Sequence, residues 1–258
     1  MNQYKILRIT ELIWTKATLN LRSEASVNYL SYVWWLVEPL LHMLVYYLVF
    51  SFFLNHGTDD YVPFLLSGLI PWLWFSKSIS HAMNSIVQGR NLMNQLYIPK
   101  VFFPLTCLIQ DFIKQIIVFF ILLVFLILYG YEPSTLWWYF LVIVIIQAVF
   151  TFAAGMISAI LVPFIRDFSI IIPTFLQFLM FASGIFFETN NMSEQTKSIF
   201  FLNPLAVIID CYRDVLIRGD IPNFSNVLYV SVLAISMLLV ALFLYKKLEY
   251  RVPRVVLE

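Results

Sequence analysis

Five ionisable side chains lie in or beside long apolar stretches of the sequence: Glu38, His42, Lys77, Asp111 and Lys114. An ionisable group in an apolar segment is costly unless it is paired or faces water, so each is a candidate functional residue. Glu38 and His42 are four residues apart, a spacing that suits acid–base chemistry on one helix face, but no third partner follows them. Asp111 and Lys114 are three apart, and the simplest interpretation is a local ion pair.

The motifs of common enzyme classes are absent from the sequence. None of the seven glycines precedes a lysine, so the chain has no phosphate-binding P-loop, and it has no G-x-S-x-G or H-E-x-x-H motif. The three histidines are far apart, and two cysteines, Cys107 and Cys211, cannot make a disulfide framework. We therefore predict that the chain is not an enzyme by itself and holds no metal or other cofactor.

The composition indicates which elements carry the charged residues. Of the 258 residues, 61% are apolar and 12% are charged, against about 45–50% and about 25% in soluble domains. So few charges cannot cover the surface of a soluble protein, and a net charge of +1 gives no field for nucleic acid. The apolar runs are continuous rather than alternating, which favours membrane helices over the strands of a barrel.

The charge-poor stretches predict an all-α, polytopic membrane protein with six transmembrane helices. We place these at residues 33–54, 62–82, 105–129, 135–161, 168–187 and 225–245, because a span needs about 20 mostly apolar residues. The whole of 1–258 is expected to be a single transmembrane domain. Its parts are an interfacial helix (1–32), helices one to five (33–187) with an inner loop at 83–104, an outer segment (188–224), and helix six with a basic inner tail (225–258).

The lysines and arginines predict the orientation, because cytoplasmic segments carry an excess of them. With both termini inside, the inner segments hold Lys5, Arg8, Lys16, Arg22, Arg90, Lys100, Arg166, Lys246, Lys247, Arg251 and Arg254. The outer segments hold Lys197, Arg213 and Arg218, and Lys77 and Lys114 lie near inner helix ends. We therefore expect a multi-pass protein of a cytoplasmic membrane with both termini in the cytoplasm.

The first 30 residues form an amphipathic pattern when wound as a helix. One side carries Lys5, Arg8, Glu11, Lys16 and Arg22, and the other carries Ile6, Leu7, Ile13, Trp14, Ala17 and Leu21. This pattern favours an interfacial helix lying along the inner membrane surface. The alternative is a packed cytoplasmic helix with no membrane contact.

The outer segment 188–224 carries helix signals of its own. Asn203 is a good N-cap, Pro204 suits the first helical position, and Gly219 suits a C-cap. The apolar face would hold Leu205, Ile208, Ile209, Tyr212 and Leu216, and the other face would hold the ion pairs Asp210–Arg213 and Asp214–Arg218. With a shorter helix at 193–202 before it, this segment is either a lid that packs on the bundle or an outer gate.

Two predicted helices present aromatic faces. Trp35, Glu38, His42, Tyr46 and Phe53 share one arc of about 80° on the first span, and Phe168, Phe175, Phe178 and Phe186 share a similar arc on the fifth. Such residues either face lipid and neighbouring helices or line a path. An aromatic-lined path suits a sugar chain, because sugar ring faces stack on aromatic rings.

The inner loop 83–104 is polar and bounded by helix breakers, with room for a short surface helix between Gly89 and Pro99. By itself it is either a plain connector or a docking site for a cytoplasmic partner.

Four sequence features together resemble a known family. They are Trp34-Trp35-Leu36-Val37-Glu38-Pro39-Leu40-Leu41 with Val45-Tyr46-Tyr47 after an interfacial helix, Tyr97-Ile98-Pro99-Lys100-Val101-Phe102-Phe103-Pro104-Leu105, Asn203-Pro204-Leu205, and a basic C-terminal tail. The chain resembles, over nearly its whole length, the membrane subunits of ABC exporters for lipid-linked bacterial polysaccharides, which export O-antigen, capsule and teichoic acid. This resemblance implies a permease of the bacterial inner membrane, with O-antigen as the first candidate cargo.

The resemblance also implies partners and site residues. The permease would be a homodimer with two copies of a separate cytoplasmic ATPase, which would bind the ATP and Mg²⁺; its other contacts would be a lipid-linked glycan and membrane lipid, and no nucleic acid. Coupling to the ATPase would fall to Asn91, Leu92, Met93, Asn94, Gln95, Leu96 and Tyr97. The translocation path would hold Trp35, Glu38, His42, Tyr46, Phe168, Phe175 and Phe178, and the outer gate Asn203, Pro204, Asp210, Tyr212 and Arg213.

Three alternatives stay open from the sequence. An ABC exporter permease for a drug or a simple lipid would share the same architecture. A membrane-embedded glycan-modifying enzyme would use Glu38 and His42. A secondary transporter would need more buried ionisable residues and an internal repeat, and the sequence shows neither.

Overall fold

A computed structural model describes residues 3–27, 31–49, 60–188 and 193–257 of the chain. Within these ranges every regular element is helical, which confirms the all-α prediction. The elements are α1 (Gln3–Val27), α2 (Ser31–Tyr47), α3 (Tyr61–Met83), α4 (Ser85–Gln88), α5 (Arg90–Gln95), α6 (Phe102–Tyr129), α7 (Trp137–Leu161), α8 (Phe168–Phe181), α9 (Glu194–Phe200), α10 (Pro204–Arg213), the π-helical η2 (Asp214–Arg218), α11 (Phe224–Leu248) and α12 (Val252–Leu257).

A helix lies at each of the six predicted ranges, but the helices are not equally long. Four of them, α3, α6, α7 and α11, are long and apolar enough to cross a membrane, and α8 is a shorter apolar helix. The first predicted span was expected to reach residue 54, but α2 ends at Tyr47, and residues 50–59 lie outside the described part of the chain. The described residues thus support four spanning helices, and the count of six stays a prediction.

The fifth predicted span, 168–187, is longer than the helix in the structure. Helix α8 ends at Phe181, and the chain turns at Gly184, whose φ of +70° is strained for any residue with a side chain. A β-carbon at Gly184 would stand 2.7 Å from the ring of Phe200. Phe186 therefore lies beyond α8, and its predicted place on the aromatic face of that helix is wrong.

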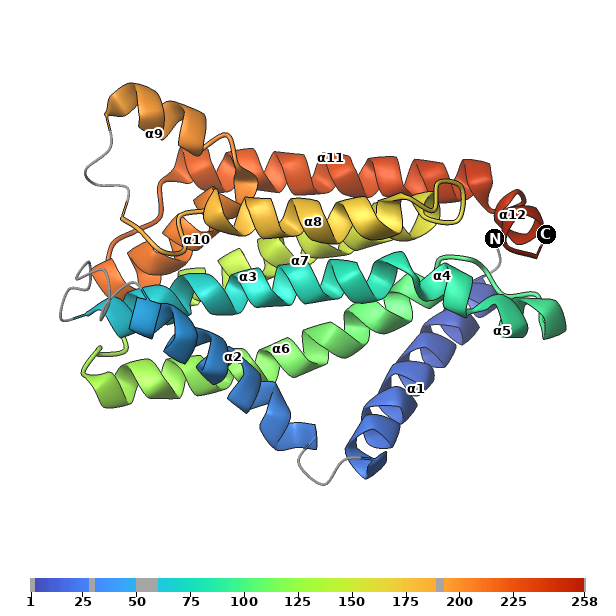
Figure 1. The fold of residues 1–258 in the computed structure, drawn as a ribbon, viewed down its shortest axis with the longest axis horizontal. Helices are drawn as coiled ribbons and strands as arrows, with labels where there is room; N and C mark the ends of the chain where they lie inside the picture. Colours follow the sequence, from blue (N-terminus) through green and yellow to red (C-terminus); the bar gives the residue numbers. More distant parts are fainter. Residues whose placement is uncertain (1–2, 28–30, 50–59, 189–192, 258) are drawn as a thin grey trace.

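Helix α3 is the centre of the bundle. It contacts α2, α6, α7, α8 and α10, and α11 packs along α7 on the far side. Figure 1 shows the axes of α3, α8 and α11 roughly aligned, with α8 antiparallel to the other two, α6 crossing obliquely, and α1 and α2 forming a V beside it. The beginning of α1 lies with α4, α5 and α12 at one end, while α9 and α10 lie at the opposite end (Figure 1).

Helix α1 packs against α6 rather than standing alone. Ile13, Ala17 and Leu21 follow one another at four-residue spacing and are all buried. Trp14 was assigned to the same apolar side but is 57% exposed, because it lies about 100° around the helix from Ile13. The buried seam fixes one face of α1 on the bundle and leaves Leu12, Trp14 and Leu19 on its surface.

Candidate functional site

Three ion pairs join helices α1, α2, α3 and α6 in a region bordered by apolar residues. Nζ of Lys114 on α6 lies 2.6 and 2.8 Å from the carboxylate oxygens of Glu24 on α1. Nζ of Lys77 on α3 lies 2.5 Å from Oε2 of Glu38 on α2. Each pair bridges two helices, so together they fasten α1 and α2 to the centre of the bundle.

The third pair joins α3 to α6. Nδ1 of His81 lies 3.0 and 3.1 Å from the two carboxylate oxygens of Asp111, which is buried. The sequence suggested a local pair between Asp111 and Lys114, but the structure gives each of them a partner on another helix. Asp111 pairs with His81 on α3 and Lys114 with Glu24 on α1, partners that lie 30 and 90 positions away in the sequence.

These charged residues line two adjoining cavities, which we call the polar furrow. The first cavity is about 350 Å³ and is lined by Glu24, Trp34, Glu38, Ile70, Leu73, Trp74, Lys77, Ser78, His81, Asp111, Lys114, Gln115 and Val118. The second is about 300 Å³ and shares Glu24, His81, Asp111 and Lys114 with the first, adding Ser80, Gln88, Cys107 and Gln110. Because Gln88 belongs to α4, the furrow extends from the inner loop to the middle of α6.

Side chains at the rim and the floor of the furrow differ in exposure. The His81 side chain is 56% exposed and that of Lys77 is 37% exposed, whereas the Asp111 side chain is 8% exposed. The furrow is therefore open along one side and closed beneath. The sequence pointed to Lys77, Asp111 and Lys114, but Glu24 and His81 were missed; the four-residue spacing of Lys77 and His81 was the available signal.

The predicted coupling residues form the short helix α5 and the turn after it. Met93 is buried against the bundle, while Leu96 and Tyr97 are 57% and 78% exposed. Asn91, Asn94 and Gln95 are exposed and Leu92 is half-buried. The predicted surface helix between Gly89 and Pro99 is thus confirmed as a structure, and its contact with an ATPase stays a prediction.

Two features hold this inner loop in place. A β-carbon at Gly89, between α4 and α5, would stand 2.2 Å from the ring of Phe103 on α6, so only glycine allows this close approach. The Lys100 side chain is folded back, with Nζ donating to the carbonyl oxygen of Ile98 at 3.1 Å. Burial lowers the pKa of Lys100. The loop is therefore anchored at both ends around the exposed Leu96 and Tyr97.

The predicted path residues on α2 contact different neighbours. Nδ1 of His42 lies 3.0 Å from the backbone oxygen of Glu38, whose carboxylate pairs with Lys77 instead. The hydroxyl of Tyr46 donates to the sulfur of Met180 at 3.6 Å, and its ring lies 4.7 Å from that of Phe186. The side chain of Trp35 and all of Phe53 lie outside the described part of the chain.

The predicted path residues on α8 lie mostly at the surface of the single chain. Phe175 and Phe178 are 60% and 73% exposed, and Phe168 is half-buried. Leu176 is the buried residue of this helix. The structure thus places Phe175 and Phe178 on an open apolar face of the chain.

The start of α10 follows the sequence prediction closely. Oδ1 of Asn203 accepts a hydrogen bond from the backbone N–H of Leu205 at 3.0 Å, and Pro204 takes the first helical position. The Asn203 side-chain amide also donates to the carbonyl oxygen of Ala182 and to Oγ of Ser183, at 3.1 and 2.9 Å. Asn203 therefore caps α10 and ties it to the end of α8.

The predicted ion pair between Arg213 and Asp210 is wrong. Arg213 is 3% exposed and donates to the carbonyl oxygens of Gly184 at 2.7 Å and Ile185 at 2.9 Å. Its guanidinium carbon also lies 3.5 Å from the ring centroid of Phe64. Burial lowers the pKa of Arg213, and an arginine remains charged at neutral pH nonetheless. The prediction failed because α10 is buried on nearly all sides rather than along one face.

Arg218, rather than Arg213, forms the ion pairs with the acidic residues of this segment. It donates to Asp214 at 2.5 Å, as the spacing predicted, and to Asp210 at 3.0 Å. The π-helical turn η2 precedes Gly219, whose φ of +69° ends the helix as a C-cap. The C-cap prediction is therefore confirmed.

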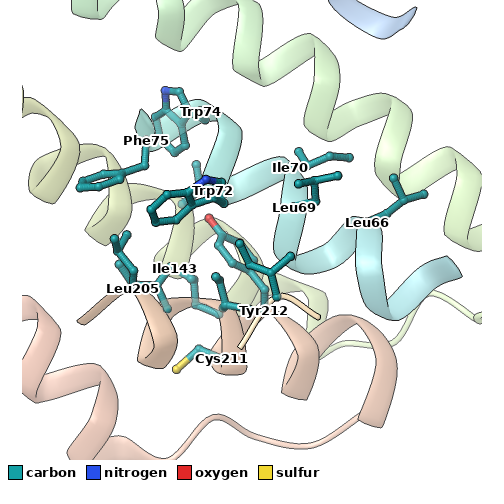
Figure 2. Close-up of a cluster of buried hydrophobic side chains, with 14 of the residues drawn as sticks. Leu66, Leu69, Ile70, Trp72, Trp74, Phe75, Ile143, Leu205, Cys211 and Tyr212 are labelled. Carbon is teal, nitrogen blue, oxygen red and sulfur yellow. The ribbon is translucent and has the colours of Figure 1, made fainter. Parts of the chain in front are cut away.

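Tyr212 connects α10 to the middle of the bundle. Its hydroxyl donates to Oε1 of Gln147 on α7 at 2.8 Å, and Nε2 of Gln147 donates to the carbonyl oxygen of Pro71 on α3 at 2.8 Å. Figure 2 shows the Tyr212 ring reaching from α10 into a cluster that includes Trp72 and Leu205. Both Tyr212 and Gln147 are fully buried, so α10 is packed as firmly as a core helix.

Comparisons with known proteins agree with this architecture. Residues 13–217 match the ABC-2 type transporter family. The O-antigen export system permease protein RfbA of Klebsiella pneumoniae is 28% identical over 244 residues, covering 93% of this chain and 92% of that protein. The RfbA protein of Myxococcus xanthus is 24% identical over 213 residues, 82% of each chain. The polysialic acid transport protein KpsM of Escherichia coli is 24% identical over 223 residues, 85% of this chain and 86% of that one. The family match covers well over half of the sequence, and the chain therefore belongs to the ABC-2 type transporter family.

Proposed function

We propose that this chain is the permease subunit of an ABC transporter that exports a polysaccharide, with a lipid-linked O-antigen as the first candidate. The supporting observation is that relatives named for O-antigen and polysialic acid transport align over more than four fifths of both chains. The chain itself would be a single transmembrane unit of the bacterial inner membrane and not an enzyme on its own.

Energy for this export would come from a separate ATPase. The chain lacks a P-loop, so ATP and Mg²⁺ would bind to the partner. Residues 91–97 are the proposed docking surface, because Met93 anchors α5 while Leu96 and Tyr97 project from it. Exposed apolar side chains rimmed by polar ones are typical of a protein interface.

A displacement of α5 by the ATPase would be transmitted directly to the spanning helices. Helix α4 follows α3 after Asn84, and the ring of Phe103 at the start of α6 packs against Gly89 between α4 and α5. The close packing of these helices leaves little room to absorb a displacement, so movement of the loop would shift the inner ends of α3 and α6. The three ion pairs of the polar furrow would carry that shift on to α1 and α2.

The path itself would form between two copies of the chain. The open face of α8, with Phe175 and Phe178, and the face of α2 with His42 and Tyr46 are the surfaces proposed to line it. Helices α9 and α10 would close its outer end, with the Asn203 and Tyr212 contacts setting how firmly they stay in place. The excess of basic residues at the end with α4, α5 and α12 favours a cytoplasmic position for both termini.

Deletion of the gene tests this proposal, with the location of the lipid-linked glycan as the readout. The expected result is accumulation of the glycan on the cytoplasmic side of the inner membrane and loss of surface polysaccharide. Re-expression of the chain restores export, and re-expression with residues 91–97 replaced by Gly-Ser repeats inserts into the membrane but does not. Normal surface glycan after the deletion would contradict the proposal.

The same experiment separates the alternatives. A drug or simple-lipid exporter would leave surface glycan normal while changing drug resistance or lipid content. A glycan-modifying enzyme would leave export intact and change the glycan structure. The geometry speaks against an enzyme built on Glu38 and His42, because His42 bonds to the backbone of Glu38 while the Glu38 carboxylate holds Lys77.

A further inference from the structure

Three residues that line the first cavity of the polar furrow carry buried polar atoms without a hydrogen-bond partner in the described part of the chain. These atoms are Nε1 of Trp74, Oγ of Ser78 and Nε2 of Gln115, and all three residues are at least nine-tenths buried. Ser80 on the same helix, by contrast, donates to the carbonyl oxygen of Ser76 at 2.8 Å. Each of these atoms exposes less than 1 Å². Unpaired buried donors are rare because they cost free energy, so a cluster beside one cavity indicates a partner that these side chains reach by turning toward the cavity.

All three unpaired groups can donate a hydrogen bond: an indole N–H, an amide NH₂ and a hydroxyl, which can also accept one. The indole N–H and the amide NH₂ need a partner that offers acceptor oxygens. The same cavity presents three carboxylates, from Glu24, Glu38 and Asp111, which accept hydrogen bonds. A ligand that matches both the unpaired donors and the carboxylates must accept hydrogen bonds from the former and donate hydrogen bonds to the latter. The hydroxyl groups of a sugar do both.

An anionic ligand fits this cavity poorly. The cations that line it are Lys77, Lys114 and His81, and each already lies against a carboxylate at 2.5 to 3.0 Å. A phosphate would have to displace those carboxylates or be held beside three of them, and both cost electrostatic free energy. The charge balance therefore favours a neutral ligand.

The walls of the cavity suit a sugar ring as well. Trp34 lines it and is 54% exposed, so the flat face of its ring can pack against the C–H face of a sugar while hydroxyl groups reach the polar side chains. A cavity of about 350 Å³ lies at the small end of ligand-binding sites. Its neighbour, lined by Gln88 of α4, opens it toward the inner loop, the side from which a cytoplasmic glycan would come.

We propose that the polar furrow is a binding subsite for one neutral sugar unit of the exported glycan. The sugar stacks on Trp34, and Ser78, Gln115 and Trp74 turn their unpaired donors toward it on binding. This inference rests on the proposed function, since it names the part of the substrate that the inner half of the permease recognises. Glu38 and Lys77 stand at the rim, so a bound sugar would also press on the ion pair that fastens α2 to α3.

A direct binding measurement tests the subsite. The full chain with its ATPase is placed in lipid nanodiscs, and saturation-transfer NMR measures binding of four soluble probes: the methyl glycosides of glucose, galactose, mannose and rhamnose. Inorganic phosphate is added as the competing anion. At least one glycoside is expected to bind, and phosphate is not expected to displace it.

Substitutions at the unpaired donors, Ser78→Ala and Gln115→Leu, should each weaken glycoside binding about fivefold, the value of one ordinary hydrogen bond. Because these donors are unpaired in the free protein, both variants should melt at the wild-type temperature or above it. Thr151→Val is the matched control: Oγ1 of Thr151 is also buried and unpaired in the described structure, but Thr151 does not line the furrow. Its glycoside binding should equal that of the wild type.

Three outcomes would overturn the subsite: no probe binds, phosphate competes with the bound glycoside, or Ser78→Ala and Gln115→Leu bind like Thr151→Val. Failure of the proposed function looks different. If deletion of the gene leaves export normal while glycosides still bind through Ser78 and Gln115, the sugar site stands and the export assignment falls. If deletion blocks export but the two variants bind normally, the subsite alone is wrong.

Discussion

The side chain of Arg213 on α10 fills the space beside Gly68 on α3: a β-carbon on Gly68 would stand 2.9 Å from Nη2 of Arg213. The guanidinium lies where a side chain on α3 would otherwise be, and from there it reaches the carbonyl oxygens of Gly184 and Ile185 after α8. Those carbonyls have left the helix, so their hydrogen bonds must come from elsewhere. A single buried arginine thus holds three segments of the outer end together.

Arg213→Met should destabilise the protein strongly. It leaves the carbonyl oxygens of Gly184 and Ile185 without their donor, at about 1–3 kcal/mol for each buried unpaired group. The measurement is the thermal midpoint of the purified chain in detergent. Lys197→Met, which breaks the ion pair with the exposed Glu194 on α9, is the control and should cost about 1 kcal/mol or less. Equal loss in the two variants would contradict the role given to Arg213.

Gly68→Ala should lower the thermal midpoint by the same route, because the added methyl group meets Arg213 and Ile209. The control is Ser76→Ala, at a half-buried position in the same helix as Gly68, which should change the thermal midpoint little. Gly130→Ala would not serve as a control, because Gly130 has a φ of +115° and any side chain there would strain the backbone. A Gly68→Ala protein as stable as Ser76→Ala would mean that Arg213 moves aside freely.

The pair of Glu24 and Lys114 can be tested by exchanging the charges. Lys114→Glu and Glu24→Lys should each release α1 from α6, since like charges then face each other where atoms now lie 2.6 Å apart. The double exchange should recover most of the loss. A disulfide between cysteines introduced at Ala17 on α1 and at a facing α6 position reports whether α1 is docked. If the single exchanges leave the crosslinking unchanged, other contacts hold α1 and the pair does not.

The sequence predicted local features better than long-range ones, and the residues show why. Asn203, Pro204 and Gly219 were assigned correctly because a cap depends on residues within one turn. Glu24 and Lys114 are 90 positions apart, and nothing in either neighbourhood indicates the other. Arg213 was predicted to pair with Asp210 on a polar face of α10, whereas the packed bundle buries Arg213 and gives it backbone carbonyl partners. The early end of α8 depends on Gly184 and Phe200, which meet only in the folded chain.

The link from Tyr212 through Gln147 to Pro71 should behave as one unit. Tyr212→Phe leaves Oε1 of Gln147 without a donor, and Gln147→Leu leaves the Tyr212 hydroxyl buried and unpaired, so each should cost about 1–3 kcal/mol. The double variant should cost clearly less than the sum, because it removes both ends of one hydrogen bond. The thermal midpoints of the three variants in detergent form the cycle, and strict additivity would contradict the link.

Tyr97→Ala should separate stability from partner binding. Tyr97 is 78% exposed and lies at the proposed docking surface, so its removal should leave the thermal midpoint unchanged but weaken capture of the ATPase subunit about tenfold. Phe224→Ala is the matched control, since Phe224 is 77% exposed but begins α11 at the opposite end of the bundle. Copurification of the ATPase with each variant is the measurement. If Phe224→Ala and Tyr97→Ala retain the ATPase equally, Tyr97 is not part of the docking surface.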